Sequence, residues 1–324
     1  MRFLIAGAGA IGAYIGALMA RAGFDVTLFA RGAHLEAMQQ HGVRVKSSAG
    51  DFESSPKISG TLTNVGTFDV VFLGVKAHSL TQLAPHLAPV LGPKTTVVST
   101  QNGIPWWFFQ GFGGEWEGLR LERIDPGGVI SSSIDAHRVV GSIVYFSTEI
   151  IAPGVIQHIE GNRISLGEPD GTRSERLRQI AEALIASGLR APITTHIRNE
   201  IAVKLLGNLA FNPVSALTRA TLAQMTKDSD VCNVVRQIMC EASTVAAKLG
   251  LELPVTIDQR IAGAAKVGEH KTSMLQDLEA GRPMELEAIV GAVVELGERV
   301  GVPMPYTETV YACAKLLSQT RLPA

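Results

Sequence analysis

Three polar side chains recur every four residues in an otherwise apolar stretch of the chain: Lys204, Asn208 and Asn212. This spacing puts all three on one face of a helix. A lysine among apolar neighbours loses hydration, which lowers its pKa and makes it a better proton donor near neutral pH. The alternative is a lysine whose stem lies on the helix while its ammonium reaches solvent. The scarcity of other polar residues in the stretch favours a catalytic acid at Lys204.

A second polar cluster follows later in the chain, with Ser273, Asp277 and Glu285. Ser273 and Asp277 form an i,i+4 pair, with Ser273 as a candidate helix N-cap, and Glu285 opens the next helical stretch. Capping and the preference of acids for the first turn of a helix explain these residues without any chemistry. The spacing alone therefore leaves both interpretations open.

Near the N-terminus, a glycine-rich loop follows the apolar run at residues 2–6 and opens a helix. The pattern G-x-G-x-x-G in this context is the dinucleotide-binding fingerprint. Its glycines permit a tight turn, close approach to a pyrophosphate and close helix–strand packing, and the helix N-terminus favours the phosphates. We therefore predict that the cofactor is bound by Gly7, Ala8, Gly9, Ala10, Ile11 and Gly12.

The end of the second strand, at residues 25–30, predicts which dinucleotide is bound. Enzymes that use NAD usually carry an acid about 20 residues after the glycines, where it holds the ribose 2′-hydroxyl. Here the strand ends at Ala30 without an acid, and the next residue is Arg31. The planar guanidinium of Arg31 suits a 2′-phosphate, so the predicted cofactor is NADP(H); a solvated surface arginine is the alternative.

Two further polar residues come directly after predicted strands. Lys76 follows the run 69–75, and Asn102 follows the run 95–100. Both therefore lie at the carboxyl edge, where open α/β sheets bind ligands. Lys76 could add positive charge near the phosphates or bind substrate, and the Asn102 amide could bond the nicotinamide or a reacting carbonyl. A loop lysine and a plain Asn-Gly turn are the alternatives.

The elements that must position these residues alternate in type over the first half of the chain. Strands at 2–6, 25–30, 69–75 and 95–100 alternate with helices, which predicts a Rossmann-type doubly wound parallel sheet. Runs at 139–148, 154–159, 163–166 and 189–193 extend that sheet, and 174–187 is helical. Beyond about residue 195 only helices are expected, at 196–217, 221–249, 256–268 and 285–300. The predicted fold class is α/β, with a dinucleotide-binding domain at 1–194 and an all-helical domain at 195–324.

Composition narrows the function classes. The chain has 324 residues and a formal net charge of −1, so nothing points to nucleic acid. Outside the N-terminus no run of about 20 apolar residues suggests a membrane span. The three cysteines lack zinc-ligand spacing, so no metal is expected, and their small number fits a reducing cytoplasm. The first 20 residues could pass for a secretory signal, but their glycine pattern argues against it.

Taken together, these residues resemble the ketopantoate reductases (2-dehydropantoate 2-reductases). The resemblance covers the whole chain in order. Its distinctive parts are the Lys-x-x-x-Asn-x-x-x-Asn-Pro stretch that starts at Lys204 and the Ser-Met-Leu-Gln-Asp stretch that starts at Ser273. The glycine loop, Arg31, Lys76, Asn102-Gly103, Gly281-Arg282 and Glu285 complete the set.

The resemblance implies a concrete reaction. Hydride would pass from NADPH to the ketone of 2-dehydropantoate, giving pantoate for pantothenate and coenzyme A synthesis, while Lys204 protonates the developing alkoxide. Glu285 would hold a substrate hydroxyl or orient Lys204. Substrate oxygens would be bound by Asn102, Asn208, Asn212 and Ser273. The helical domains of such enzymes often pair, so a homodimer is the expected assembly.

Two departures from the family pattern concern the substrate. Residues 104–128 form a long segment that contains all three tryptophans, Trp106, Trp107 and Trp116, and could be a lid, a reshaped pocket or a packed edge loop. Val290-Gly291 stands where the family often has Asn-Gly. Reduction of another 2-oxo acid is therefore the first alternative, and a non-catalytic NADP(H) sensor is the second. A dehydrogenase that uses NAD is disfavoured by Arg31.

Overall fold

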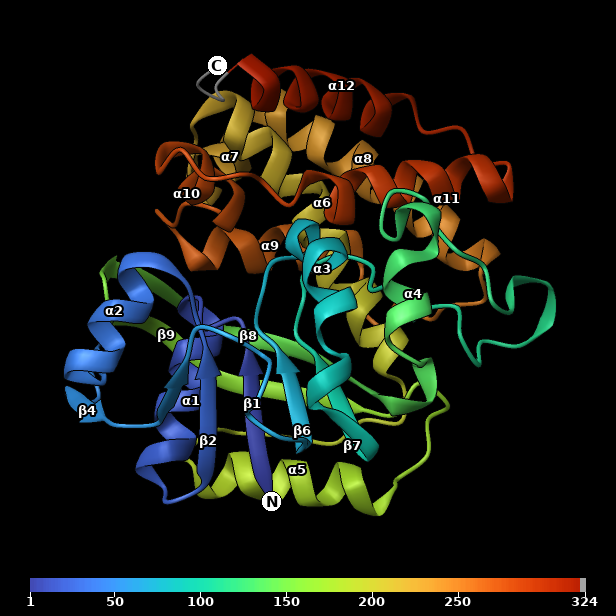
Figure 1. The fold of residues 1–324 in the computed structure, drawn as a ribbon. Coiled ribbons are helices and arrows are strands. Elements are labelled where there is room, and N and C mark those ends of the chain that lie inside the picture. The colour runs from blue at the N-terminus through green and yellow to red at the C-terminus, as the bar shows by residue number, and fades with distance from the viewer. Residues whose placement is uncertain (321–324) are drawn as a thin grey trace. The chain divides into compact units, whose positions relative to one another are not determined.

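A computed structural model describes residues 1–320 and divides the chain into two compact units (Figure 1). The first unit comprises Met1–Gln101, Trp107–Gly118 and Gly128–Ile197. The second comprises Asn102–Trp106, Leu119–Gly127 and the chain from Arg198 onward. Two short segments of the first half thus belong to the second unit, which a single boundary near residue 194 does not anticipate.

The first unit is built on one nine-stranded sheet in the order β4-β3-β9-β8-β7-β6-β1-β2-β5. The run from β8 to β5 pairs entirely in parallel, and β3 is also parallel to β9. Two pairs, β8·β9 and β3·β4, are antiparallel. The strands are β1 (Arg2–Ala6), β2 (Asp25–Phe29), β3 (Val43–Ser47), β4 (Phe52–Ser54), β5 (Lys57–Ser59), β6 (Phe68–Leu73), β7 (Leu91–Ser99), β8 (Val139–Ala152) and β9 (Val155–Gly167). The predicted α/β fold class, with antiparallel strands extending a parallel sheet, is confirmed.

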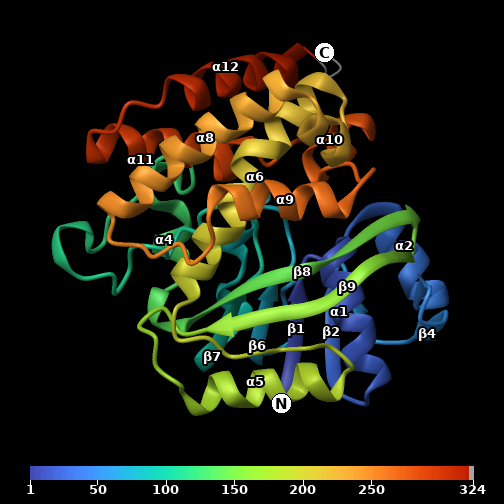
Figure 2. The ribbon, with the colours of Figure 1, turned by 180° about the vertical axis from the view of Figure 1, so that it is seen from behind.

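Apolar strands and alanine-rich helices supply the core of this unit. Helices α1 (Ala10–Arg21) and α5 (Glu175–Ala186) share one buried cluster with the strands. Phe3, Ile5 and Leu28 are fully buried in it, and each such side chain contributes roughly 1.5–3 kcal/mol relative to an exposed one. Figure 2, seen from behind, shows α5 and the long β8–β9 ribbon. This core fixes β1, β2 and β6, whose carboxyl ends carry the predicted cofactor residues.

Three strand predictions differ from the structure. The runs 154–159 and 163–166 are one strand, β9, because Gly161 makes a bulge and not a turn: its φ is +76°, and an added Cβ would lie 2.3 Å from the Tyr145 carbonyl oxygen. The predicted strand 189–193 is reduced to two single-residue bridges, Arg163–Arg190 and Leu166–Ile193. The short strands β3, β4 and β5 were not predicted, since three to five residues carry little periodicity.

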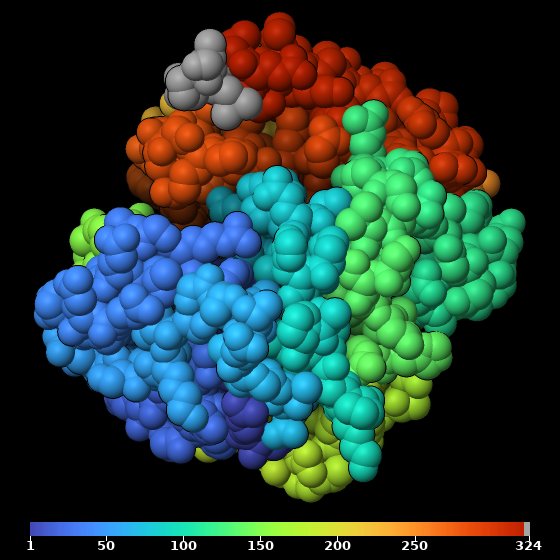
Figure 3. All heavy atoms as spheres, in the orientation of Figure 1, coloured from blue at the N-terminus to red at the C-terminus, as the bar shows by residue number. Residues whose placement is uncertain are grey.

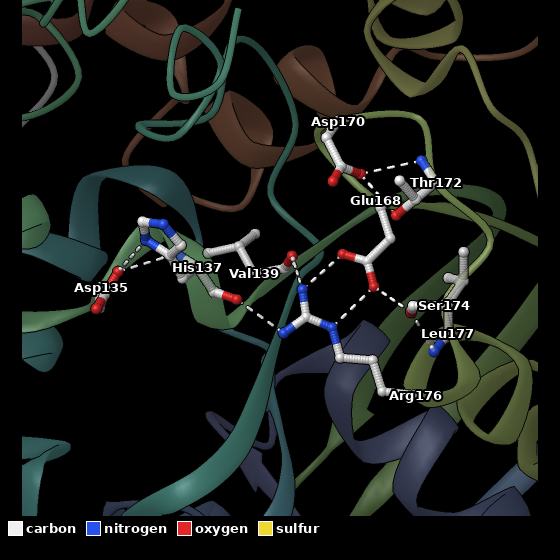
Figure 4. A network of polar contacts seen from close by, with 9 residues as sticks. All are labelled: Asp135, His137, Val139, Glu168, Asp170, Thr172, Ser174, Arg176 and Leu177. Atoms are coloured by element: carbon white, nitrogen blue, oxygen red, sulfur yellow. Dashed lines mark hydrogen bonds and ion pairs between the residues drawn. The ribbon is translucent and has the colours of Figure 1, made fainter.

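A buried carboxylate ties the end of β9 to the start of α5 (Figure 4). Glu168 is 3% exposed, and its Oε2 lies 2.6 Å from Nη2 of Arg176, while Nε of Arg176 donates to Oε1 at 2.8 Å. The same guanidinium donates to the His137 carbonyl at 2.8 Å, and Ser174 both donates to Glu168 and caps α5. Because Glu168 binds donors at the start of α5 and Arg176 also reaches the His137 carbonyl, this network is best explained as a structural clamp.

The second unit contains helices only among its described elements. They are α6 (Ile197–Thr218), α7 (Leu222–Lys227), α8 (Ser229–Lys248), α9 (Ile257–Val267), α10 (Ser273–Glu279), the π-helical turn η6 (Glu287–Gly291), α11 (Ala292–Val300) and α12 (Pro305–Thr320). The predicted helix 221–249 is split at Asp228, whose carboxylate caps α8. The helical turn expected to begin at Ser273 is α10, and helix α12 was not predicted.

The remaining elements are short and lie mostly in the first unit. They are α2 (Gly32–His41), α3 (Ala77–Leu83), η1 (Ala84–His86), η2 (Ala88–Val90), η3 (Gly114–Trp116), η4 (Pro126–Gly128), α4 (Val129–Ser133) and η5 (Ala136–Arg138). Helices α2 and α3 begin just after β2 and β6, so the turns that precede them carry Arg31 and Lys76.

Helix α6 is long and apolar enough to cross a membrane by length and composition alone. Of its most apolar stretch, 61% is buried inside the protein, as in the core helix of a globular unit. Lys204 and the asparagines interrupt its apolar sequence, so it does not form a continuous run of about 20 apolar residues. Within residues 1–320 no group of three or more His, Cys, Asp or Glu residues could hold a metal ion.

Candidate active site

Lys204 lies in the middle of α6, where the apolar sequence predicts a buried helix face. Its Nζ donates a hydrogen bond of 2.7 Å to Oδ1 of Asn102. Burial lowers the pKa of Lys204 to about 8, because the charged ammonium is poorly solvated there, and the nearby charge of Glu285 opposes part of that shift. A lysine with this pKa carries a transferable proton at neutral pH and can neutralise a developing negative charge.

Glu285 is the second charged group of the site. Glu285 is 8% exposed and lies just before the π-helical turn η6. Together Asn102, Lys204 and Glu285 combine a neutral acceptor, a proton donor and a carboxylate within the second unit. Asn102 comes from the first half of the sequence, so the segment Asn102–Trp106 brings it to the helical unit.

The other predicted substrate residues lie on two different helices, α6 and α10. Asn208 and Asn212 follow Lys204 at helical spacing on α6. Asn212 is 4% exposed, and its amide Nδ2 has no hydrogen-bond partner among the described residues, which is costly unless a ligand supplies an acceptor. Ser273 is the exposed first residue of α10, and the cap of that helix is Thr272 instead. The described contacts do not join Ser273 to Lys204.

The glycine loop of the first unit has the geometry that its sequence predicts. Gly7 has a φ of +111°, and an added Cβ there would lie 2.4 Å from Val75. A Cβ on Gly12 would lie 2.3 Å from the Gly7 carbonyl oxygen. At Gly9 nothing lies closer than 3.6 Å, so the protein's own packing leaves room above that residue. Gly7 and Gly12 are thus required by the fold, whereas the packing around Gly9 leaves the space that a ligand close to the backbone would need.

The start of α1 fits a phosphate group. Its N-cap is Gly9, with no side-chain cap and no acidic residue in the first turn. Free backbone N–H groups and the positive end of the helix dipole therefore stay available for an anion. The amide of Ala8 donates to the Phe29 carbonyl at 2.8 Å, which fixes the loop against the end of β2.

The predicted cofactor cations lie at the carboxyl ends of their strands. Arg31 is exposed at the N-cap of α2, with its guanidinium carbon 5.4 Å from the centre of the Phe29 ring. Lys76 is half-buried at the N-cap of α3. Neither the end of β2 nor the first turn of α2 carries an acid. The first unit thus has two cations and no carboxylate in the turns that follow β2 and β6.

Two residues that help to shape this edge of the sheet were not assigned from the sequence. Gly74 ends β6, where an added Cβ would lie 2.3 Å from the Gly7 carbonyl oxygen. Gln101 donates to the carbonyls of Leu73 and Val75 at 2.8 and 3.0 Å, which ties the end of β7 to that of β6. A glycine at the end of an apolar strand was the available signal for Gly74. No local signal marks Gln101.

The aromatic segment 104–128 is largely packed at its start and exposed at its tip. Trp107 is fully buried and covers Gly141 of β8, where an added Cβ would lie 2.6 Å from the indole. Phe108 and Phe109 are buried as well. Residues 111–118 are mostly exposed, as the green atoms at the right of Figure 3 show. These contacts favour the packed loop over the lid for Trp107.

Comparison with protein-family models identifies both halves of the chain. Residues 3–106 match the model described as ketopantoate reductase PanE/ApbA, and residues 196–318 match the one described as ketopantoate reductase PanE/ApbA C terminal. Most of the aromatic segment lies between the two matched ranges.

Individual proteins and structures agree with the family models. A Mesorhizobium japonicum protein named 2-dehydropantoate 2-reductase is 49% identical over 322 residues, which cover 99% of each chain. A Ralstonia solanacearum structure, provisionally named a ketopantoate reductase, is 39% identical with a TM-score of 0.94 and covers 99% of this chain and 98% of its own. The ternary structure of a D-mandelate dehydrogenase with NADH and anilino(oxo)acetate shares the fold at 22% identity, with a TM-score of 0.85 and 99% of each chain covered.

Proposed function

The chain belongs to the ketopantoate reductase family, and from this premise we propose that it reduces 2-dehydropantoate to pantoate with NADPH. The observation that carries the proposal is the buried Lys204, bonded to Asn102 and influenced by the charge of Glu285. The chemistry of such a reduction requires a proton donor at the carbonyl oxygen, and Lys204 has the pKa and the surroundings for that role.

The residues of the first unit fit a dinucleotide with a 2′-phosphate. Gly9 leaves room for a pyrophosphate over the uncapped start of α1, and Arg31 stands where an NAD enzyme would carry an acid. Lys76 adds a second cation at the same edge of the sheet. When bound, the dinucleotide supplies the hydride.

The side chains of the second unit would carry out the rest of the reaction. The ammonium of Lys204 donates its proton to the carbonyl oxygen as negative charge develops there, and before transfer it stabilises that charge. The Asn102 oxygen accepts from the ammonium and so orients it. Asn208 and Asn212 provide amides for the substrate oxygens, and the unpartnered Nδ2 of Asn212 supports this role. Glu285 would accept from a substrate hydroxyl.

The proposal is tested by following NADPH oxidation at 340 nm with 2-dehydropantoate and a panel of other 2-oxo acids, aromatic ones included. We expect the highest kcat/KM with 2-dehydropantoate. A preference for a bulkier acid would keep the chemistry and change the substrate, which would point to the aromatic segment. Tight binding of NADPH without turnover of any 2-oxo acid would overturn the enzyme proposal in favour of a sensor.

The reduction should depend on pH through Lys204. Since the donor must be protonated and its pKa is about 8, kcat/KM should be constant at lower pH and fall about tenfold per pH unit above 8. In the wild type the negative charge of Glu285 raises the pKa of Lys204. Glu285→Gln removes that charge, so the pKa of Lys204 and the inflection should move to lower pH. Lys204→Arg serves as the control, since arginine does not titrate in this range. An unchanged inflection in that variant would assign it to another group.

A further inference from the structure

A π-helical turn follows the predicted catalytic carboxylate directly. It spans Glu287–Gly291, two residues after Glu285, and the amide of Ala292 closes it by donating to the Glu287 carbonyl. Residues 288–291 are buried. Such turns are rare and occur mostly at functional sites, which raises the question of what this one holds in place.

The turn binds the segment that carries Asn102. The Ala288 carbonyl accepts a hydrogen bond of 3.0 Å from the amide of Ile104. The backbone of Gly103 packs closely on the same Ala288 carbonyl. Its φ is +86°, and an added Cβ would lie 2.1 Å from the Ala288 oxygen. Asn102, the residue before Gly103, accepts a hydrogen bond from the Lys204 ammonium through its Oδ1. The position of Ala288 therefore determines where the Asn102 amide meets the ammonium.

Two side chains from separate segments bind Glu287, the first residue of the turn. The Tyr311 hydroxyl of α12 lies 2.8 Å from each carboxylate oxygen of Glu287, and Nη1 of Arg123 donates to that hydroxyl at 2.8 Å. Arg123 Nη1 also lies 3.3 Å from Glu287 Oε2. Gly291 makes room, since a Cβ there would lie 2.5 Å from the same oxygen.

Arg123, Glu287 and Tyr311 are called the lock from here on. The lock is anchored to a further helix, and the Tyr311 hydroxyl stays protonated. The buried Glu295 of α11 accepts from the backbone amides of Glu122 and Arg123 at 2.9 and 3.0 Å, which fixes the segment Leu119–Gly127. Burial and the Glu287 carboxylate raise the pKa of Tyr311 far above its usual range, so it remains a donor. The Arg123 and Glu287 side chains are about 40% exposed, so their ion pair alone contributes little to the stability of the turn. The Tyr311 hydroxyl, which binds both side chains, is therefore the central contact of the lock.

We propose that Arg123, Glu287 and Tyr311 are positioning residues for the reductase, which fix the π turn so that Ala288 holds Asn102 against Lys204. The proposal rests on the proposed function for its kinetic consequences. Without the lock the turn can relax toward an α-helix, and a change of one residue in helical phase rotates its carbonyls by roughly 100°. Ile104 then loses its acceptor, Asn102 moves, and the ammonium of Lys204 loses the acceptor that orients it.

The test is Tyr311→Phe, which removes the hydroxyl and keeps the ring. We expect kcat to fall roughly 10-fold, the loss of one well-placed hydrogen bond, with the KM of NADPH unchanged within about twofold. The inflection of the pH profile should move to lower pH, because an ammonium with a weaker acceptor loses its proton more readily. Tyr306→Phe is the matched control, an exposed tyrosine on the same helix outside the lock.

A double-mutant cycle separates positioning from a general loss of structure. If Tyr311 acts through Asn102, Tyr311→Phe should change kcat little in an Asn102→Ala background. Equal losses in both backgrounds would overturn the proposal, as would an unchanged pH inflection in Tyr311→Phe. Glu287→Gln, which keeps an acceptor for the hydroxyl, should retain more activity than Glu287→Ala.

A direct measurement distinguishes this proposal from the proposed function. The Lys204 side chain can be titrated by nuclear magnetic resonance without substrate, with Lys204→Arg used for assignment. A lower pKa of Lys204 in Tyr311→Phe than in the wild type would support the positioning role even if no 2-oxo acid were reduced. The same pKa in both proteins would refute that role even in an active reductase.

Discussion

Lys204→Ala is expected to lower kcat for 2-dehydropantoate reduction by about 10³-fold, a loss typical for a general acid that also stabilises developing charge. The variant should bind NADPH with nearly wild-type affinity, because Lys204 lies on α6, whereas the glycine loop, Arg31 and Lys76, which we propose bind the dinucleotide, belong to the first unit. The measurement is steady-state NADPH oxidation, together with a titration of NADPH binding by its fluorescence.

Two comparisons make this result specific. Lys248→Ala removes an exposed lysine from α8 in the same unit and should leave kcat unchanged. A small primary amine added to Lys204→Ala should restore part of the activity, since it can occupy the space beside Asn102 and donate a proton. A loss of less than about tenfold in Lys204→Ala would mean that another group or water protonates the alkoxide.

Arg31→Ala should raise the KM of NADPH about 10- to 100-fold while that of NADH changes less than about twofold. The range follows from the roughly 1.5–3 kcal/mol of a hydrogen bond between charged groups. The guanidinium is exposed at the start of α2, so its removal should disturb the fold little. Kinetics with both dinucleotides, and binding titrations for each, measure the change.

The matched control for Arg31 is Arg44→Ala on β3, whose guanidinium pairs with Glu53 and is similarly exposed. It should leave both KM values as they are in the wild type. Equal losses of NADPH and NADH affinity in Arg31→Ala would show that the side chain supports the loop and does not recognise a 2′-phosphate. The choice between NADP and NAD would then lie with other residues, Lys76 first among them.

The parts of the fold that could be predicted are those that local sequence determines. The apolar run of β1, the glycine loop and the start of α1 follow one another in the chain, so their pattern is complete within about 30 residues. The face shared by Lys204, Asn208 and Asn212 follows from helical periodicity alone. Positive φ angles at Gly7 and Gly103 likewise agree with glycine being the residue that adopts them most easily.

What could not be predicted depends on contacts between distant segments. Nothing near Asn102 in sequence indicates that Ile104 binds Ala288, and no pattern marks residues 287–291 as a π turn. The pairing of β3 with β9 joins residues more than 100 positions apart, and β3 is only five residues long. The predicted strand 189–193 has the right composition, but only two of its residues form bridges to β9.

Val290, where the sequence departs from the family pattern, lies inside the π turn. Val290 is fully buried in the π turn. Its side chain therefore contributes to the packing of the turn. The family resemblance alone could not decide this, because it compares residue types and not their surroundings.

The path of the chain has a consequence for recombination and inheritance. The segments Asn102–Trp106 and Leu119–Gly127 are encoded within the first half of the gene but fold with the second unit. A crossover between two related genes near codon 197 would take Asn102 and Arg123 from one parent, and Lys204, Ala288 and Glu295 from the other. Chimeras should work only when both parents carry compatible pairs, so these positions should be inherited together although they are far apart in the gene.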